Sequence, residues 1–386
     1  MNRNLVFVSV SLLTWGLGES AFLAFQPLYL QELGADPLKI GTIYGGYGIA
    51  ASLAHVPAGY LSDRYGRRPL MWAGWFVGLT AAWVMALANS LPWFVVGMLL
   101  YGLTMFVISP LNSYVTAASG NQTVGRTLTL VSSAYNIGSI SGPLLGGLIG
   151  DRFGYRTIFF MAGIVFILST LLILLIRPQP RDQHTSQVKK SQLFTNKRYL
   201  IFLPVFFSVV FAMYLPQPLS PNFLQNQHQL SLSMIGWLYS ISGVGIVVFN
   251  LTLGQLDARL GFLLGQLAVG LFSILMWQGQ GVTAFAVAYF LVGGFRTARI
   301  LATAQVRALI HSADMGLGYG LMETAGAIAL ILAAPIAGYL YEQNPVSIYV
   351  VSAVLIVITI LISIIFSYHR PASISKTRHD TQEIVS

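Results

Sequence analysis

The ten residues GYLSDRYGRR, from Gly59 to Arg68, place one acidic residue and three arginines between two long apolar segments. Charges are scarce elsewhere, because Asp, Glu, Lys and Arg make up 9% of the 386 residues whereas 55% are hydrophobic. An ordinary soluble domain carries about 25% charged residues. The composition therefore predicts an integral membrane protein, in which this charged stretch is a loop between two spans.

Apolar stretches long enough to cross a bilayer recur along the whole chain. A hydrocarbon core of roughly 30 Å requires about 20 helical residues. We place spans at residues 5–31, 39–62, 70–89, 92–118, 126–150, 157–177, 199–225, 232–256, 261–279, 282–306, 317–341 and 346–369. The first stretch is too long for the core of a cleavable signal, so we expect it to be the first span. The predicted fold class is an all-α integral membrane protein with twelve transmembrane helices.

One long polar segment divides these spans into two sets of six. We expect an N-terminal six-helix half at 1–177, a linker at 178–198, a C-terminal six-helix half at 199–369 and a tail at 370–386. A weak repeat supports this division, because GPLLGGLIGD at 142–151 recurs loosely as APIAGYLYEQ at 334–343, and GQLDARLG at 254–261 resembles the opening stretch. Two related halves with a site near the midplane are typical of secondary transporters.

The basic residues predict the orientation of the chain. Most of the 21 lysines and arginines fall at the amino terminus, in the loops after even-numbered spans, in the linker and in the tail. Lys39, Arg152 and Arg156 are exceptions. Since short cytoplasmic loops carry the excess of basic residues, we expect both termini in the cytoplasm of a multi-pass protein of the cell (inner) membrane.

Several function classes lack their motifs. The net charge is +9, but the chain has too little polar surface to form a basic patch that binds nucleic acid. Because the sequence contains no cysteine, disulfides and thiolate metal sites are excluded. The sequence has neither a phosphate-binding glycine loop with its Lys-Ser/Thr pair nor the His-Glu-x-x-His and Gly-x-Ser-x-Gly motifs. We therefore expect no enzyme, no metal, no cofactor and no nucleic-acid partner, and a monomer in the lipid bilayer.

With its twelve predicted spans and the stretch at 59–68, the chain resembles the major facilitator superfamily over its whole length. The family signature G-x-x-x-D-R-x-G-R-R between spans two and three is matched by Gly59, Asp63, Arg64, Gly66, Arg67 and Arg68. The resemblance implies a conformational latch, in which Asp63 lies near the start of span eleven and is favoured by the positive end of that helix. A basic anchor alone would explain the arginines but not the acid or the glycine spacing.

A second motif lies in span five. The stretch GSISGPLLGG is similar to the signature of proton-coupled antiporters, which is matched by Gly138, Gly142, Pro143, Gly146 and Gly147. Close helix packing by small residues is the alternative interpretation. Span four has no arginine where many drug antiporters keep one, which leaves proton coupling through that position in doubt.

Four ionisable residues lie within the predicted spans, where such residues are candidates for function. Glu19 is near the middle of span one, Arg296 and Arg299 are one turn apart in span ten, and Glu323 is at a matching depth in span eleven. We expect Glu323 to form a buried bridge with Arg299 or Arg296. The remaining arginine then needs Glu19, a substrate anion or water as its partner.

The resemblance implies that spans one, four, seven and ten line a central cavity. Glu19 and Arg296 would then lie on facing walls, and Glu19 would exchange a proton during transport. Polar residues of the same spans are further candidates for the lining, and each has an ordinary interhelical hydrogen bond as its alternative: Asn112, Tyr214, Gln217 and Asn222. Prolines in YLPQPLSPNF at 214–223 predict that span seven is interrupted.

Three functions remain open from the sequence. The resemblance implies a secondary transporter, and we expect proton-coupled antiport, with efflux of small amphipathic organic molecules. The two span-ten arginines favour an alternative, a transporter of small organic anions. A non-transporting membrane sensor or scaffold is the alternative of another class, because a fold alone does not establish function.

Overall fold

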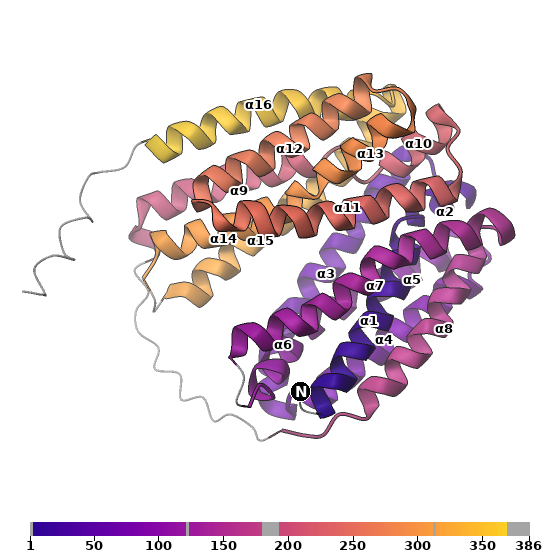
Figure 1. Ribbon diagram of the computed structural model, residues 1–386, viewed down its shortest axis with the longest axis vertical. Coiled ribbons are helices and arrows are strands. Elements are labelled where there is room, and N and C mark those ends of the chain that lie inside the picture. Colours follow the sequence, from indigo (N-terminus) through magenta and orange to yellow (C-terminus); the bar gives the residue numbers. More distant parts are fainter. Residues whose placement is uncertain (1–2, 121–122, 180–192, 312–313, 369–386) are drawn as a thin grey trace, which may run out of the picture.

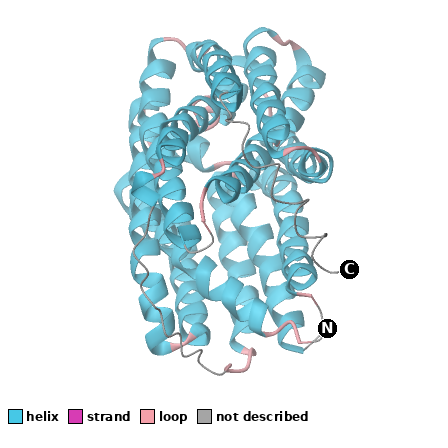
Figure 2. Cartoon of the chain, turned by 90° about the vertical axis from the view of Figure 1, so that its left-hand side faces the viewer, coloured by secondary structure: helices cyan, strands magenta, loops and turns pink. Residues whose placement is uncertain are grey.

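The computed structural model describes residues 3–120, 123–179, 193–311 and 314–368, and this part of the chain contains helices and no strands (Figure 1, Figure 2). The first set of elements comprises α1 (Arg3–Leu23), α2 (Gln26–Glu32), α3 (Pro37–Tyr65), α4 (Arg67–Leu87), α5 (Leu91–Leu103), the 3-10 turn η1 (Thr104–Val107), α6 (Ile108–Ala117), α7 (Val124–Phe153) and α8 (Tyr155–Leu174). The second set comprises η2 (Leu193–Thr195), α9 (Lys197–Tyr214), α10 (Ser220–His228), α11 (Leu232–Thr252), η3 (Leu253–Gln255), α12 (Ala258–Gln278), α13 (Gly281–Val292), α14 (Gly294–Leu309), α15 (Met315–Gln343) and α16 (Ser347–Tyr368).

These helices account for twelve spans, as the hydropathy predicts. Ten helical segments of the described chain are long and apolar enough to cross a membrane. The other two spans are α3 and α7, which at 29 and 30 residues exceed the roughly 20 that a bilayer needs. The all-α membrane fold is therefore confirmed. Residues 180–192 and 369–386, which hold most of the expected linker and tail, lie outside the described residues.

Span seven is interrupted, as its prolines predict, and span one is interrupted for the same reason. α9 ends at Tyr214, four residues before Pro218, and α1 ends at Leu23, four residues before Pro27. A proline has no N–H to donate to the carbonyl four residues earlier, and its ring clashes with that carbonyl. The break in span one was not predicted, although Pro27 is the residue that would have indicated it.

Spans four and ten are interrupted as well. In span four the turn η1 contains Phe106, four residues before Pro110, and in span ten the helices α13 and α14 are separated by Gly293. Broken helices are tolerated in membranes where the freed carbonyls line a cavity or pack against protein. The four broken spans are therefore candidates for the walls of a central site.

The two sets of helices pack as separate bundles that meet along two helix pairs. Within the first bundle α1 packs on α7 and α8, and within the second α12 packs on α14 and α16. Across the bundles α3 packs on α15 and α7 packs on α11, with the bundles side by side in Figure 1. The bundles are therefore joined mainly along the pairs α3–α15 and α7–α11.

Several hydrogen bonds between the bundles lie at the end of the molecule that carries α2 and α10, which we call the closed end. There Asn222 Nδ2 donates to the Pro27 carbonyl at 3.1 Å and to Gln31 Oε1 at 2.6 Å. Tyr155 OH donates to Gln225 Oε1 at 2.8 Å. The opposite end carries the basic loop between α3 and α4, and we call it the basic end.

Glycines allow α3 and α15 to approach closely at the closed end. A Cβ added at Gly41 would overlap the Ala334 carbonyl, and one added at Gly338 would overlap the Pro37 carbonyl. Both contacts join the start of α3 to the last turns of α15, where a side chain of any size would push the bundles apart. The close contact between the backbones of α3 and α15 therefore closes this end of the molecule.

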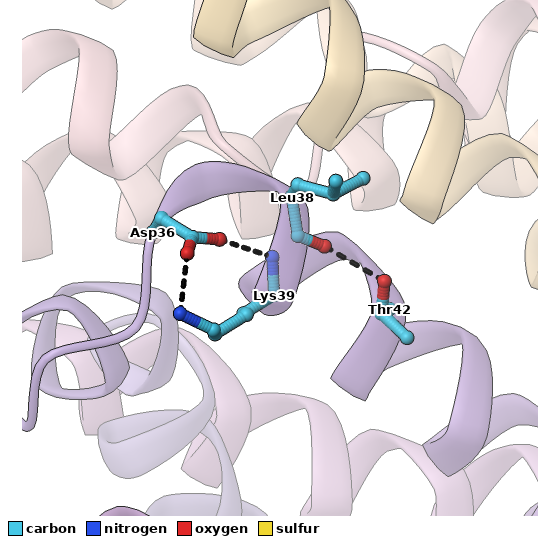
Figure 3. Close-up of polar contacts among 4 residues, drawn as sticks. All are labelled: Asp36, Leu38, Lys39 and Thr42. Atoms are coloured by element: carbon cyan, nitrogen blue, oxygen red, sulfur yellow. Dashed lines mark hydrogen bonds and ion pairs between the residues drawn. The ribbon is translucent and has the colours of Figure 1, made fainter.

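The start of α3 explains why a lysine is tolerated at the closed end. Asp36 Oδ1 accepts a hydrogen bond from the Lys39 backbone at 2.7 Å, and its Oδ2 pairs with Lys39 Nζ at 2.6 Å (Figure 3). One turn later Thr42 Oγ1 donates to the Leu38 carbonyl at 2.8 Å (Figure 3). The hydrogen bond from the ammonium holds the pKa of Asp36 below its ordinary value. Lys39, an exception to the charge pattern, is therefore neutralised locally.

Asp151, at the end of α7, caps the first turn of α11 in the other bundle. Its Oδ1 accepts from the Leu232 backbone at 2.8 Å, and its Oδ2 accepts from the Ser233 backbone at 2.9 Å and from the Ser233 hydroxyl. Partial burial opposes ionisation, but the hydrogen bonds from Ser233 and Leu232 outweigh it and lower the pKa of Asp151. The carboxylate that makes this contact is thus retained at any pH above its ordinary range near 4.

We expect Asp151→Ala to weaken the closed end by about 1 kcal/mol, the typical effect of losing a helix cap. Ser132 lines a cavity between the two bundles. Since the chain has no native cysteine, Ser132→Cys can report access to a membrane-impermeant thiol reagent from the closed side. Labelling should rise several-fold in Asp151→Ala and less in Asp151→Asn, which keeps one acceptor.

The pH dependence follows from the lowered pKa of Asp151. The cap is present above the ordinary pKa and is lost only as the pH falls through the lowered one. Labelling of the parent Ser132→Cys protein from the closed side should therefore be constant between pH 5 and pH 8. A rise in that interval would show that another group controls the closed end.

Candidate functional site

A cavity of about 540 Å³ lies between the bundles and is lined mainly by the first one. Its walls come from α1, α3, α4, α7 and the broken span four, with one residue, Arg296, from α14. Lining residues of α6 and α7, such as Val115 and Leu128, lie towards the basic end, so the cavity extends from the middle of the bundle towards that end. The molecule is thus closed at one end and hollow towards the other.

Glu19 lies in this cavity on α1 and is 7% exposed. The Tyr135 hydroxyl of α7 donates to Glu19 Oε2 at 2.8 Å, and Tyr101 is a second phenolic neighbour. Close packing of the two helices produces this contact, because a Cβ added at Gly16 would lie 2.5 Å from the Tyr135 carbonyl oxygen. Glu19 is one turn after Gly16, so it faces the same side of α1.

Arg296 brings the second charge into the cavity from the other bundle. Its side chain is exposed to the cavity, and its positive charge acts on both Glu19 and Tyr135. The structure therefore places Glu19 and Arg296 on facing walls, with Tyr135 beside both. The breaks in both spans lie close to these residues: span one is interrupted at residues 24–25, shortly after Glu19, and span ten at Gly293, shortly before Arg296.

Arg299 and Glu323 form the ion pair that the sequence suggested, but the pair is not buried. Arg299 Nη2 lies 2.6 Å from Glu323 Oε2, and the two side chains are 30% and 55% exposed. The expectation of a buried bridge was wrong, because both side chains are partly exposed where α14 and α15 lie side by side. Arg296 is accordingly left without this carboxylate.

We expect Glu323→Gln to change the free energy of unfolding by less than about 1 kcal/mol, because exposed pairs contribute about 0.2–1 kcal/mol. A double-mutant cycle with Arg299→Gln, followed by denaturation in detergent, should give a coupling energy in the same range. A loss of 3 kcal/mol or more for Glu323→Gln alone would contradict this interpretation and indicate a desolvated pair.

An aromatic wall stands beside Glu19. Trp15, one turn before it on α1, stacks on Phe166 at 4.3 Å between ring centroids, and Trp75 lies 5.0 Å from Trp15. The Trp75 indole N–H donates to the hydroxyl of Ser11 at 2.9 Å, which fixes the ring. Sequence reasoning missed these residues. The spacing of Trp15 and Glu19, four residues apart on one helix face, was the available signal.

The polar candidates of spans four and seven separate into different environments. Asn112 lines the cavity, as expected. Tyr214 instead packs with its ring 6.1 Å from that of Phe295, and Gln217 Nε2 donates to a carbonyl of its own segment at 2.7 Å. Neither belongs to the cavity lining. Asn222, 1% exposed, is a closed-end contact rather than a cavity residue, because the break in span seven redirects α10 towards α2.

The glycines of the span-five motif all serve close packing, but against two different partners. A Cβ added at Gly138, Gly142 or Gly146 would meet the backbone of α1 in the same bundle. One added at Gly147 would meet the Leu232 carbonyl of α11 in the other bundle. Pro143 is accommodated within the continuous helix α7. Most glycines of the motif thus pack α7 against α1 within the first bundle, whereas Gly147 packs α7 against α11 at the closed end.

The loop motif is described in part. Gly66 adopts φ 88° between α3 and α4, a conformation that favours glycine. Arg67 Nη1 donates to Gln179 Oε1 at 3.3 Å, and the Arg68 guanidinium lies 4.0 Å from the centre of the Trp72 ring. Gly59, Asp63 and Arg64 lie in α3, but the side chains of residues 55–64 are outside the described part of the chain.

A family comparison identifies the fold. The model described as the Major Facilitator Superfamily matches residues 8–217 and 202–385. The chain belongs to this superfamily. Its members are membrane transporters rather than enzymes, and the spans described above make this chain a multi-pass membrane protein, as the resemblance implied.

Individual relatives of this major facilitator protein are distant. An uncharacterized MFS-type transporter of Methanocaldococcus jannaschii is 27% identical over 45% of this chain and 45% of its own length. The multi-drug resistance efflux pump PmrA of Streptococcus pneumoniae is 23% identical over 64% of this chain and 65% of its own length. The matches thus span about half to two thirds of these relatives.

A solved structure shows the shared fold over the whole length. The crystal structure of a mutant of the nucleoside transporter NupG superposes with a TM-score of 0.84 at 16% identity. The superposition covers 95% of this major facilitator chain and 100% of that chain. At this identity the likeness establishes the fold alone.

Proposed function

We propose that this protein is a transporter that exports small amphipathic organic molecules in exchange for protons. The observation that carries the proposal is Glu19, a carboxyl within the membrane that reaches the central cavity and faces Arg296 of the other bundle. Such a group can take up and release a proton as its surroundings alternate. The similarity to a multi-drug resistance efflux pump supports export.

The proposed cycle is alternating access by rocking of the two bundles. We assign the basic end to the cytoplasm, because short basic loops remain there, and both termini with it. The molecule then lies in the inner membrane with its cavity towards the cytoplasm and its closed end outside. We further propose domains at 1–177 and 199–369, joined by the linker 178–198 and followed by the tail 370–386.

In the opposite state the basic end closes, and we propose that Asp63 then acts as the latch at the start of α15. The carboxylate would be favoured by the positive end of that helix. The loop partners Gly59, Arg64, Gly66, Arg67 and Arg68 hold it there. Normal transport by Asp63→Asn at normal expression would rule this role out.

An observation also favours the second candidate, transport of small organic anions. Glu323 neutralises Arg299, so the charge of Arg296 is available to the cavity. Span four, in which many drug antiporters keep an arginine, contributes the uncharged polar residue Asn112 to the cavity lining. An anion on Arg296 would be balanced electrically when Glu19 takes up a proton.

Transport into sealed liposomes tests these candidates. Purified protein is reconstituted, an inward or outward pH gradient is imposed, and accumulation of a fluorescent rhodamine dye is followed with and without a protonophore. We expect gradient-driven accumulation that the protonophore collapses. Faster flux of a negatively charged dye than of its ester would favour the anion candidate. No flux of any dye in either gradient would overturn export and leave the non-transporting sensor or scaffold.

A further inference from the structure

We propose that the cavity selects zwitterionic aromatic molecules, with the cationic group of the ligand on Glu19 and its anionic group on Arg296. The inference rests on the proposed function of the same cavity and concerns the charge of the molecule that is carried. It follows from the charges of the lining, from the side of the cavity on which each lies, and from the aromatic wall.

The lining carries one charge of each sign. Among the described residues that line the cavity, Glu19 and Arg296 are the only charged ones. Arg299, one turn further along α14, is already paired with Glu323 at 2.6 Å. The cavity is therefore electrically balanced as it stands.

A ligand with a single charge upsets this balance. A cation on Glu19 would leave Arg296 without a negative charge opposite it. An anion on Arg296 would leave an ionised Glu19 with the Tyr135 hydroxyl as its hydrogen-bond donor but without a positive charge, unless Glu19 takes up a proton. A charge away from water and without a partner is strongly unfavourable. A zwitterion gives Glu19 a positive charge and Arg296 a negative charge in place of their attraction to each other, so neither charged group is left unpaired.

The two charges are close enough for a small zwitterion. The Tyr135 hydroxyl donates to Glu19 at 2.8 Å, and the same hydroxyl lies beside Arg296, which acts on it electrostatically. A single phenol thus neighbours both charged groups. A small zwitterion beside Tyr135 can therefore reach both groups, and the Tyr135 hydroxyl remains available as a hydrogen-bond partner.

The rest of the lining suits an aromatic body. Trp15, Tyr47 and Trp75 line the cavity together with Glu19, and Trp15 is held by its stack on Phe166. Offset or edge-on ring contacts of this kind contribute beyond the burial of area. The volume of about 540 Å³ leaves room for a fused ring system beside the charged group.

The location of the charges gives a zwitterion a further advantage in the cycle. Glu19 belongs to the first bundle and Arg296 to the second. A ligand favours a conformation only by its differential affinity for it. A zwitterion contacts both bundles and favours the state in which they approach, whereas an ion of one sign contacts one charged group and lacks this effect.

A matched set of indoles tests the proposal, because its members share one ring and differ in charge. The probes are tryptophan, tryptamine, indole-3-propionate and 3-ethylindole, which are zwitterionic, cationic, anionic and neutral at neutral pH. Binding to the purified full chain in detergent is measured by calorimetry and by thermal shift. We expect tryptophan to bind at least about tenfold more tightly than each of the other three, as loss of one charged hydrogen bond predicts.

Two variants and one control assign the preference to these residues. Arg296→Gln should bind tryptamine as tightly as tryptophan, and Glu19→Gln should do the same for indole-3-propionate. The paired control Arg299→Gln with Glu323→Gln, which removes the neighbouring ion pair without a net change of charge, should keep the preference of the parent. Monodispersity and helix content of each variant show that it is folded.

The outcomes separate this inference from the proposed function. Equal binding of all four indoles, binding of none, or a tryptophan preference that survives both cavity variants would overturn the inference. Gradient-driven dye transport can persist in each of those cases. Conversely, a tryptophan preference that both variants abolish, without any proton-driven flux, would support the selective site and overturn the antiporter.

Discussion

Glu19→Gln is expected to fold normally and to abolish the dependence of transport on the proton gradient. The amide keeps an oxygen that accepts the Tyr135 hydroxyl, which lies 2.8 Å from the carboxylate in the parent protein. It mimics the protonated carboxyl and cannot release a proton, so the pH profile of exchange between unlabelled and labelled substrate should become flat. Uphill accumulation in liposomes with an imposed pH gradient should fall to the level of empty liposomes.

A second glutamate provides the matched control for this substitution. Glu342, near the end of α15, is exposed and lies outside the cavity, so Glu342→Gln should keep gradient-driven accumulation. Melting temperatures of both variants establish that the difference is not one of folding. If Glu19→Gln retains uphill transport with the parent pH profile, Glu19 does not couple the proton, and the anion candidate with Arg296 gains.

Gly147→Ala is expected to stop transport while leaving each bundle folded. The added Cβ would overlap the carbonyl oxygen of Leu232, a backbone atom of α11 that is not free to rotate away. Overpacking of this kind costs about 1–3 kcal/mol, and here it opposes only the state in which the closed end is formed. A shift of that size changes the balance of the two states by roughly 5- to 150-fold.

The same helix supplies two comparisons for Gly147→Ala. At Gly125 an added Cβ meets nothing within 4 Å, so Gly125→Ala should transport normally. At Gly142 it would overlap Leu17 and Ser20 of α1, in the same bundle, so Gly142→Ala should lower the melting temperature instead. Labelling of Ser132→Cys from the closed side should rise in Gly147→Ala and not in Gly125→Ala. Normal transport by Gly147→Ala would show that the closed end does not form tightly during the cycle.

The sequence by itself determined the twelve spans and the positions of the motifs. Hydropathy is a local property, and a bilayer requires every backbone polar group to be satisfied within its own helix, so each span can be recognised without its neighbours. The ionisable residues were found for a related reason, since Glu19 and Arg296 stand out in apolar segments wherever those segments lie. Prolines in span seven likewise predicted its break from the covalent chemistry of the residue.

Only the tertiary structure decided which residues meet. The rotation of each helix about its axis and the bend at each break determine the partners, and no local pattern encodes them. The ion pair of Arg299 with Glu323 is therefore half-exposed rather than buried, and Asn222 belongs to the closed end rather than the cavity. Trp15 joins the aromatic wall because glycines leave room for the rings: a Cβ added at Gly78 of α4 would overlap the Trp15 ring, and one added at Gly18 of α1 would overlap the Phe166 ring. Helix packing, and not periodicity, brings these residues together.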